Sequence, residues 1–123
     1  MLGGEERCHS VFNGLLALKS FAKKNDWVLV HDAARPLLHH NDIDKLIMSL
    51  DRHPVGGLLG YPIKNTVKFL NNNQFLETLD RKKLWMAVTP QMFRYHWLVN
   101  AFDSTIKKNQ FPSDEANAIE LFG

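Results

Sequence analysis

The sequence lacks the features of secreted, disulfide-bonded and membrane-spanning proteins. It has a single cysteine, Cys8, so no disulfide can form within the chain, which suits a reducing compartment. It has no run of about 18 apolar residues that could span a bilayer. Glu5, Glu6 and Arg7 stand where a signal peptide needs its apolar stretch. We therefore expect a cytoplasmic protein with no membrane partner.

The signatures of several catalytic and metal sites are also missing. The sequence contains no Walker loop, no G-x-S-x-G nucleophile elbow and no complete G-x-G-x-x-G fingerprint. The adjacent pair His39-His40 lacks the spacing at which a helix presents two metal ligands, and no cysteine partners accompany it. We therefore expect no structural metal site.

The charge pattern argues against a nucleic-acid partner. The net charge of the 123 residues is +2, with both signs interleaved. The basic clusters at 23–24, 81–83 and 107–108 lie far apart in the sequence, whereas binding to a nucleic-acid backbone needs one concentrated cationic face. With 45% hydrophobic residues, the composition is that of an ordinary soluble globular protein with room for one core.

Apolar periodicity predicts helices and strands in alternation. Helical spacing predicts an amphipathic helix over about 7–24, and Asn41 can cap a second amphipathic helix. Short apolar runs at 27–30 and 57–63 predict buried strands on either side of that second helix. Because strand, helix and strand in this order are typical of a βαβ unit, we expect an α/β fold with a parallel sheet.

Residues 66–79 depart from this alternation. The stretches 66–70 and 74–79 flank the turn-forming group Asn71-Asn72-Asn73, which predicts a β-hairpin. Because an isolated two-stranded hairpin is only marginally stable in water, we expect it to pack against another subunit as a dimerisation arm. The chain is therefore treated as one domain over 1–123, with the arm at about 64–83.

Two further helices are predicted beyond the hairpin. Thr89-Pro90 is interpreted as the approach to a helix whose apolar face includes Tyr95 and Phe102. Ser113 is interpreted as the N-cap of a last helix, which opens with two acidic residues.

Asp32, Ala33 and Arg35 come directly after the predicted strand at 27–30, at the position where open α/β sheets bind their ligands. The backbone amides of such a turn can hold a phosphate oxygen, and Arg35 can bind a phosphate in bidentate fashion. Asp32 can accept from a sugar hydroxyl or orient a metal-bound water. A salt bridge between Asp32 and Arg35 that only closes the turn is an equally good interpretation.

Three other places carry weaker indications of a site. Gly3-Gly4 would let a backbone approach a ligand, with the Ser10 hydroxyl in the following helix, although two such glycines are more often a flexible tail. Arg81 lies just beyond the hairpin, where it could reach across a dimer, or it is an ordinary surface charge. Ser113 and the acidic residues after it also fit a routine helix start.

Five stretches, taken in order, resemble the 2-C-methyl-D-erythritol 4-phosphate cytidylyltransferase family. They are Gly3-Gly4 through Arg7 to Ser10-Val11, His31-Asp32-Ala33-Ala34-Arg35-Pro36, Thr66-Val67-Lys68, Asp80-Arg81 through Leu84-Trp85 to Thr89-Pro90-Gln91, and Asp114-Glu115. The run from His31 to Pro36 is the most specific of them. The resemblance covers essentially the whole chain but only the central part of such an enzyme.

For the fold, the resemblance implies a Rossmann-like nucleotidyltransferase sheet with flanking helices and a protruding β-hairpin dimerisation arm, here as a partial domain. For the function, it implies transfer of CMP from CTP to 2-C-methyl-D-erythritol 4-phosphate with release of pyrophosphate, in non-mevalonate isoprenoid biosynthesis. The implied partners are CTP, the polyol phosphate and a second copy of the chain in a homodimer. Mg²⁺ would be carried by the CTP phosphates.

The resemblance also implies roles for individual residues of this chain. CTP would be bound by Gly4, Glu5, Ser10, Asp32 and Ala33. The polyol phosphate would be bound by Asp32, Ala33, Arg35, Thr66, Arg81, Thr89 and Ser113, with Arg81 and Asp32 as the catalytic residues. Thr66 and Arg81 would belong to the arm and complete the site of the neighbouring subunit, where Arg81 would position the attacking phosphate.

Departures from the family pattern leave alternatives open. The glycine-rich loop that cradles the triphosphate and the Lys-bearing carboxyl-terminal segment of the family do not occur in the chain, so these 123 residues alone are expected to have little or no activity. Asn65 and Ser113 stand where the family usually has Asp and Thr. The alternatives are a non-catalytic dimerisation or nucleotide-binding remnant, and a ribitol 5-phosphate cytidylyltransferase, a related group that usually differs at Ala33 and Ala34.

Overall fold

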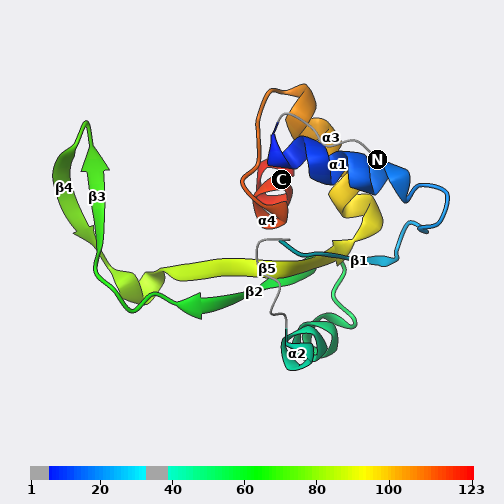
Figure 1. The fold of residues 1–123 in the computed structure, drawn as a ribbon, viewed down its shortest axis with the longest axis horizontal. Helices are drawn as coiled ribbons and strands as arrows, with labels where there is room; N and C mark the ends of the chain where they lie inside the picture. Colours follow the sequence, from blue (N-terminus) through cyan, green and yellow to red (C-terminus); the bar gives the residue numbers. More distant parts are fainter. Residues whose placement is uncertain (1–5, 33–38) are drawn as a thin grey trace.

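A three-stranded sheet forms the centre of the fold (Figure 1). In the computed structural model, which describes residues 6–32 and 39–123, its strands are β1 (Trp27–Val30), β2 (Gly56–Pro62) and β5 (Trp85–Arg94), in the order β1-β5-β2. β5 runs antiparallel to both neighbours, so β1 and β2 run parallel to each other without pairing. The expectation of a parallel sheet is therefore wrong for these strands, because a strand from later in the sequence lies between the two strands of the βαβ unit.

The Thr89-Pro90 pair lies inside β5, a strand that was not predicted, and β5 leads directly into the predicted helix, which begins at Tyr95. Proline has no N–H to donate, and strands accommodate it at an edge or at a bulge. Leu58 of β2 lies opposite Gln91, whereas the next residue, Leu59, lies opposite Val88. The Thr89-Pro90 pair therefore has no partner on β2, and this bulge takes Thr89 out of the regular ladder.

Helices cover both faces of the sheet (Figure 1). α1 (Arg7–Ala17), α3 (Tyr95–Lys107) and α4 (Glu115–Phe122) lie on one face, and α2 (His40–Leu50) lies on the other. The helices of the first group meet the sheet in a buried core, whose side chains are Cys8, Leu15, Phe93, Tyr95, Leu98, Ala101, Phe102 and Ala118. No helix within the described residues is long and apolar enough to cross a membrane.

The helix boundaries correct the predictions in three places. α2 has His39 as its N-cap, so Asn41 lies inside the helix and does not cap it. α1 ends at Ala17 and not near residue 24, because the longer helix would leave almost no chain for the turn into β1. α4 is capped by Asp114 and not by Ser113, since a carboxylate both accepts the capping bond and interacts favourably with the positive end of the helix.

A β-hairpin forms at the predicted residues. β3 (Val67–Asn71) pairs antiparallel with β4 (Gln74–Leu79), and Asn72 and Asn73 between them have φ angles of 51° and 64°. Asparagine tolerates this left-handed conformation, which a two-residue hairpin turn needs at both positions. The hairpin stands away from the rest of the chain (Figure 1), and its exposed apolar side chains are Phe69, Leu70, Phe75 and Leu76. Its role in dimerisation stays a prediction.

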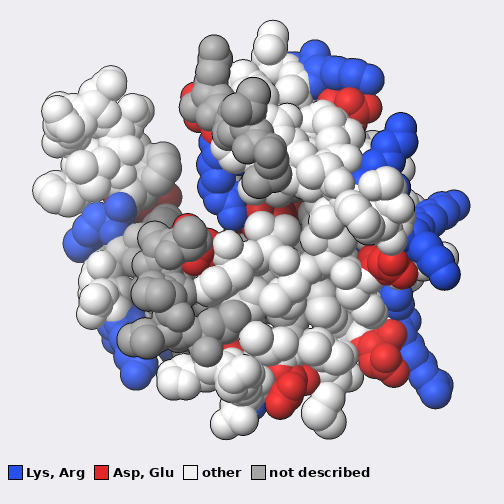
Figure 2. Space-filling model, turned by 45° about the vertical axis from the view of Figure 1, so that its right-hand side comes forward, with Lys and Arg blue, Asp and Glu red and all other residues white. Residues whose placement is uncertain are grey.

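Charges of both signs are interspersed on the face of the molecule that Figure 2 shows. On the face that Figure 2 shows, Lys and Arg side chains project at separate places, with Asp and Glu between them. This is the interleaving expected from the sequence.

Arg94, at the end of β5, ties the sheet to two loops. Its Nη1 donates to the carbonyl of Asn25 at 2.9 Å, and its Nη2 donates to the carbonyls of His53 at 3.2 Å and Asp51 at 3.3 Å. The guanidinium also lies 3.7 Å from the centre of the Trp27 ring, which is a favourable cation–π distance. One side chain therefore joins the turn before β1, the loop before β2 and the end of β5.

We expect Arg94→Lys to lower the free energy of unfolding by about 1–2 kcal/mol, because an ammonium cannot reproduce the planar fork that reaches three carbonyls. Urea denaturation measures the change. Arg52→Lys, at an exposed position in one of the same loops, is the control and should change stability by less than about 0.5 kcal/mol. Equal stability of the Arg94→Lys variant and the unsubstituted chain would contradict the role of Arg94.

Candidate active site

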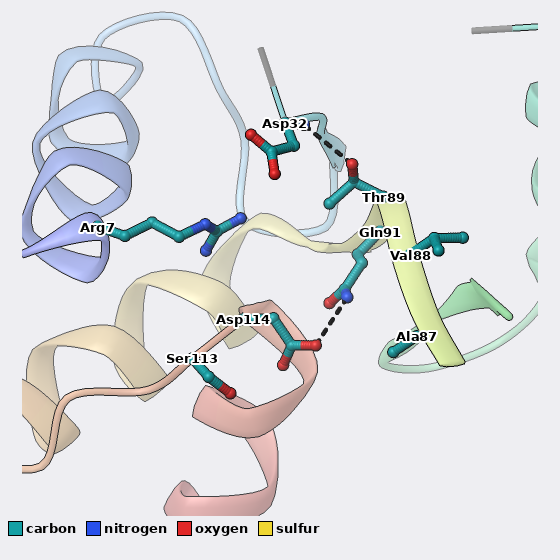
Figure 3. Close-up of a pocket in the computed structure, with 8 residues that line it drawn as sticks. All are labelled: Arg7, Asp32, Ala87, Val88, Thr89, Gln91, Ser113 and Asp114. Carbon is teal, nitrogen blue, oxygen red and sulfur yellow. Dashed lines mark hydrogen bonds between the residues drawn. The ribbon is translucent and has the colours of Figure 1, made fainter. Parts of the chain in front are cut away.

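Side chains from four distant parts of the chain meet around one pocket (Figure 3). Its volume is about 200 Å³. The start of α1, the loop after β1, strand β5 and the turn before α4 supply its lining residues, which are Arg7, Asp32, Ala87, Val88, Thr89, Gln91, Ser113 and Asp114. Most of these side chains are polar, so the pocket suits a hydrophilic ligand.

The bulge in β5 holds Asp32. The backbone N–H of Asp32 donates to Thr89 Oγ1 at 3.0 Å, across 57 residues of sequence. This bond fixes the backbone of Asp32, while its exposed carboxylate lies on the side of the pocket toward which Arg7 extends (Figure 3). Asp32 thus sits just past the carboxyl end of β1, at the edge of the sheet where the sequence predicted a ligand site.

Arg7 joins the pocket to a buried carboxylate. Its Nη1 lies 2.8 Å from Glu115 Oε1, and the Glu115 side chain is 0% exposed whereas that of Arg7 is 37% exposed. At this distance the guanidinium and the carboxylate attract each other both as a hydrogen-bonding pair and as opposite charges. Burial alone would lower the pKa of Arg7, but Glu115, with smaller contributions from Asp32 and Asp114, raises it above its ordinary value. Arg7 is therefore a permanent cation in the pocket wall.

Gln91 joins β5 to the start of α4. Its side chain is buried, with Nε2 donating to Asp114 Oδ2 at 3.0 Å and Oε1 accepting from the N–H of Ala116 at 2.9 Å. Figure 3 shows the first of these bonds, between two residues that line the pocket. The turn that carries Ser113 is therefore fixed relative to β5.

The structure brings together three of the predicted site residues, Asp32, Thr89 and Ser113. Ser10 lies elsewhere, in a hollow between α1 and β1. The remaining predicted residues of this part of the site lie outside the described residues, and they are Gly4, Glu5, Ala33 and Arg35. Whether Asp32 pairs with Arg35 is therefore also outside the described structure.

Thr66 and Arg81 do not line the pocket of their own chain. Thr66 precedes β3, and Arg81 begins the short 3₁₀ helix η1 (Arg81–Lys83) that follows β4. Arg81 Nη1 donates to the carbonyl of Lys64 at 2.6 Å, which closes the base of the hairpin. Their assignment to the site of a neighbouring subunit stays a prediction.

Five pocket residues received no role from the sequence: Arg7, Ala87, Val88, Gln91 and Asp114. Arg7, Gln91 and Asp114 stand within the stretches that resemble the family, so this ordered resemblance was the available signal. Ala87 and Val88 precede the bulge on β5, and no local pattern marks them.

The sheet, its covering helices and the polar pocket beyond the end of β1 define an α/β nucleotidyltransferase domain. The chain belongs to the 2-C-methyl-D-erythritol 4-phosphate cytidylyltransferase (IspD) family, whose model matches residues 1–123. The resemblance seen in the five sequence stretches is thereby confirmed.

Curated relatives and solved structures agree with this membership. The 2-C-methyl-D-erythritol 4-phosphate cytidylyltransferase of Vesicomyosocius okutanii is 44% identical over 120 residues, which are 98% of this chain and 50% of that protein. That of Pseudomonas savastanoi pv. phaseolicola is 49% identical over 123 residues, covering 98% and 52%. The crystal structure of the Francisella tularensis enzyme matches with a TM-score of 0.89 and 40% identity, over 98% of this chain and 57% of that one. The chain thus spans about half the length of the curated relatives it matches.

We expect the two partners of the buried ion pair to differ in their effect on stability. Arg7→Met leaves the fully buried Glu115 without its cation and should lower the free energy of unfolding by about 3 kcal/mol. Glu115→Gln leaves Arg7 partly in contact with water, and it should cost less, about 1 kcal/mol. Thermal and urea denaturation measure both changes.

The double substitution Arg7→Met with Glu115→Gln should be more stable than Arg7→Met alone, because no unpaired buried charge remains. Asp103→Asn, which removes an exposed pair with Lys107 at 3.0 Å, is the control and should change stability by less than about 0.5 kcal/mol. A larger loss from Glu115→Gln than from Arg7→Met would show that this account of the pair is wrong.

Proposed function

We propose that the protein takes part in the transfer of CMP from CTP to 2-C-methyl-D-erythritol 4-phosphate, with release of pyrophosphate, in isoprenoid biosynthesis in the cytoplasm. The observation that carries this proposal is the meeting of Asp32, Thr89 and Ser113 in one pocket of a chain that belongs to this family. Because the chain spans about half the length of its relatives, the complete reaction is proposed for the longest reading frame that contains these residues. Little or no activity is expected of the 123 residues alone.

In the proposed reaction the phosphate of the polyol attacks the α-phosphorus of CTP, a new P–O bond forms, and pyrophosphate leaves. Little covalent chemistry falls to the protein, whose contribution is to position the reactants and stabilise charge. The Asp32 carboxylate would accept from a polyol hydroxyl, and the hydroxyls of Thr89 and Ser113 would bond to neighbouring oxygens of the substrate.

The charges around the pocket suggest how the polyol phosphate would lie. Asp32 and Asp114 line the pocket, and its one described cation, Arg7, is already paired with Glu115. A phosphate group among these carboxylates would be repelled, whereas the hydroxyls of a polyol would find an acceptor in Asp32. We therefore expect the hydroxyl-bearing end in this pocket and the phosphate end toward a further cation, for which Arg81 is the proposed candidate.

Arg81 would reach the phosphate from a second subunit. Arg81 and Thr66 lie at the base of the hairpin and not at the pocket of their own chain. The hairpin exposes apolar side chains, among them Phe75 at 71%, and burial of such a surface stabilises association. A homodimer through the arm would bury these apolar side chains and would also bring Arg81 of one subunit to the pocket of the other.

Magnesium would arrive on the phosphates of CTP, where it would neutralise part of their charge. Carboxylate oxygens are ligands that Mg²⁺ prefers, and Asp32 offers them in the pocket. The residues that the structure describes include no group of three or more His, Cys, Asp or Glu that could hold a metal ion. We propose that Asp32 contacts the ion that the nucleotide holds.

Pyrophosphate release tests the reaction directly. We expect release from CTP and 2-C-methyl-D-erythritol 4-phosphate with the longest reading frame, and little or none with the 123-residue chain. Ribitol 5-phosphate as acceptor is the control for the substrate. Release in neither protein would support a non-catalytic remnant, and preference for ribitol 5-phosphate would show that the proposed substrate is wrong.

Arg81→Ala in the active protein should lower turnover at least about tenfold, because a charge-assisted hydrogen bond contributes roughly 1.5 to 3 kcal/mol. Steady-state pyrophosphate release measures turnover. Lys82→Ala, the next residue in η1 and also exposed, is the matched control and should leave turnover within about twofold. Unchanged turnover of the Arg81→Ala variant would remove Arg81 from the site.

Mixing two inactive variants tests whether Arg81 serves the other subunit. In a mixed dimer of an Arg81→Ala chain with an Asp32→Asn chain, one of the two sites has both an intact Asp32 and an intact Arg81 from the partner. Random mixing should therefore recover about a quarter of the unsubstituted activity. A mixture as inactive as its two components would show that Arg81 acts within its own chain.

A further inference from the structure

Beside the pocket, the side chain of Gln91 makes hydrogen bonds with the start of α4 that are largely buried. Gln91 is 1% exposed, and burial of an amide is unfavourable unless its donor and acceptor are both satisfied. The N–H of Ala116 can only donate, so the atom of Gln91 that faces it at 2.9 Å is the oxygen, Oε1. The amide nitrogen therefore faces Asp114, where it donates to Oδ2 at 3.0 Å.

Asp114 is shared between this contact and the start of α4. Its other oxygen, Oδ1, accepts from the N–H of Asn117 at 2.7 Å, and the Asn117 side chain in turn accepts from the N–H of Ser113 at 3.1 Å. Ser113 is thus held on one side by Asn117 and on the other by its chain neighbour Asp114. Every bond in this set depends on the side chain of Gln91 or on the helix start that it fixes.

The same strand also sets the position of Thr89. Gln91 follows the bulge in β5, and Thr89 lies within that bulge. Thr89 holds the backbone of Asp32 through its hydroxyl. The separation between Thr89 and the backbone of Ser113 is therefore fixed by the contact of Gln91 with α4, although Gln91 itself is almost completely buried.

We propose that Gln91 and Asp114 are a pair of positioning residues that hold the Ser113 hydroxyl at the distance from Thr89 and Asp32 that the polyol phosphate requires. This inference rests on the proposed function. Gln91 contributes an amide donor and acceptor, and Asp114 contributes two acceptors, without either side chain having to touch the substrate. The competing account is that the Asp114 carboxylate, which lines the pocket, binds the substrate itself.

Exchanging the two polar groups separates these accounts. Gln91→Glu places a carboxylate against the Asp114 carboxylate, and Asp114→Asn has a single oxygen, so it cannot both cap α4 and accept from Gln91. Combined, the two substitutions restore every bond. The carboxylate introduced at position 91 would accept from the N–H of Ala116 and from the amide introduced at position 114, whose oxygen would still cap α4. The net charge of the pair is unchanged.

The kinetic test uses the longest reading frame that contains the chain, with steady-state pyrophosphate release. Each single substitution should raise the KM for the polyol phosphate at least about tenfold, the effect of losing one charge-assisted bond. The KM for CTP should change much less. The double variant should return the KM for the polyol phosphate to within about threefold of the unsubstituted protein.

Thr105→Val is the control for a loss of stability that leaves the residues of the pocket in place. The Thr105 hydroxyl is buried, 1% exposed, and donates to the carbonyl of Ala101 at 2.8 Å inside α3, away from the pocket. This variant should melt at a lower temperature while both KM values stay unchanged. Melting temperatures of all variants are measured beside the kinetics, and the double variant should recover most of the loss caused by each single substitution.

Three outcomes would overturn the inference. If the double variant regains its melting temperature but not its KM, the Asp114 carboxylate contacts the substrate itself. If the single variants melt lower, as Thr105→Val does, while their KM values stay unchanged, Gln91 and Asp114 only stabilise the fold. If the unsubstituted protein releases no pyrophosphate from CTP and 2-C-methyl-D-erythritol 4-phosphate, the proposed function itself is wrong, and the inference with it.

Discussion

Pro90 cannot donate a hydrogen bond to a neighbouring strand, and the sheet accommodates this by a bulge in its central strand, β5. The position of β5 between β1 and β2 leaves it no free edge along its carboxyl-terminal half. A proline can therefore be tolerated there only where the ladder is interrupted. The interruption frees Thr89 from the ladder, and the Thr89 hydroxyl then accepts from the backbone of Asp32. A constraint of covalent structure thus decides where the polar residues of the pocket stand.

The charges around the pocket determine which ligand groups it favours. Glu115 is completely buried, and Arg7 is the cation that lies beside it at 2.8 Å. Arg7 is the one cation among the described residues that line the pocket, which also contains the carboxylates of Asp32 and Asp114. A pocket of this kind favours hydroxyls over phosphates. The proposed site therefore depends on charges brought from outside it, by the nucleotide with its magnesium and by the arm of a second subunit.

The sequence predicted the features that depend on residues close together in the chain. The asparagines at 72 and 73 set the hairpin turn, and the helical spacing from Tyr95 onward is that of α3. It did not predict β5, because a strand with an internal proline has no regular alternation, and its place between β1 and β2 depends on contacts far apart in sequence. The sequence did not predict the role of Gln91 either, because that role also depends on contacts between residues far apart in the sequence. Glutamine is a residue type that usually lies at the surface, and only the tertiary fold buries Gln91 against α4.

The pocket and the hairpin are parts of one continuous ribbon. β2 pairs with β5 from Leu58 opposite Gln91, beside the pocket, to Pro62 opposite Trp85, just after η1 and Arg81. The backbone bonds of this pair connect the two regions directly, so a shift of the hairpin would act on the bulge through β5. If a second subunit holds the hairpin, as proposed, association does more than supply Arg81 to the neighbouring site. It also restrains the strand that positions Thr89 and Gln91, so dimer formation and the geometry of the chain's own pocket would be coupled.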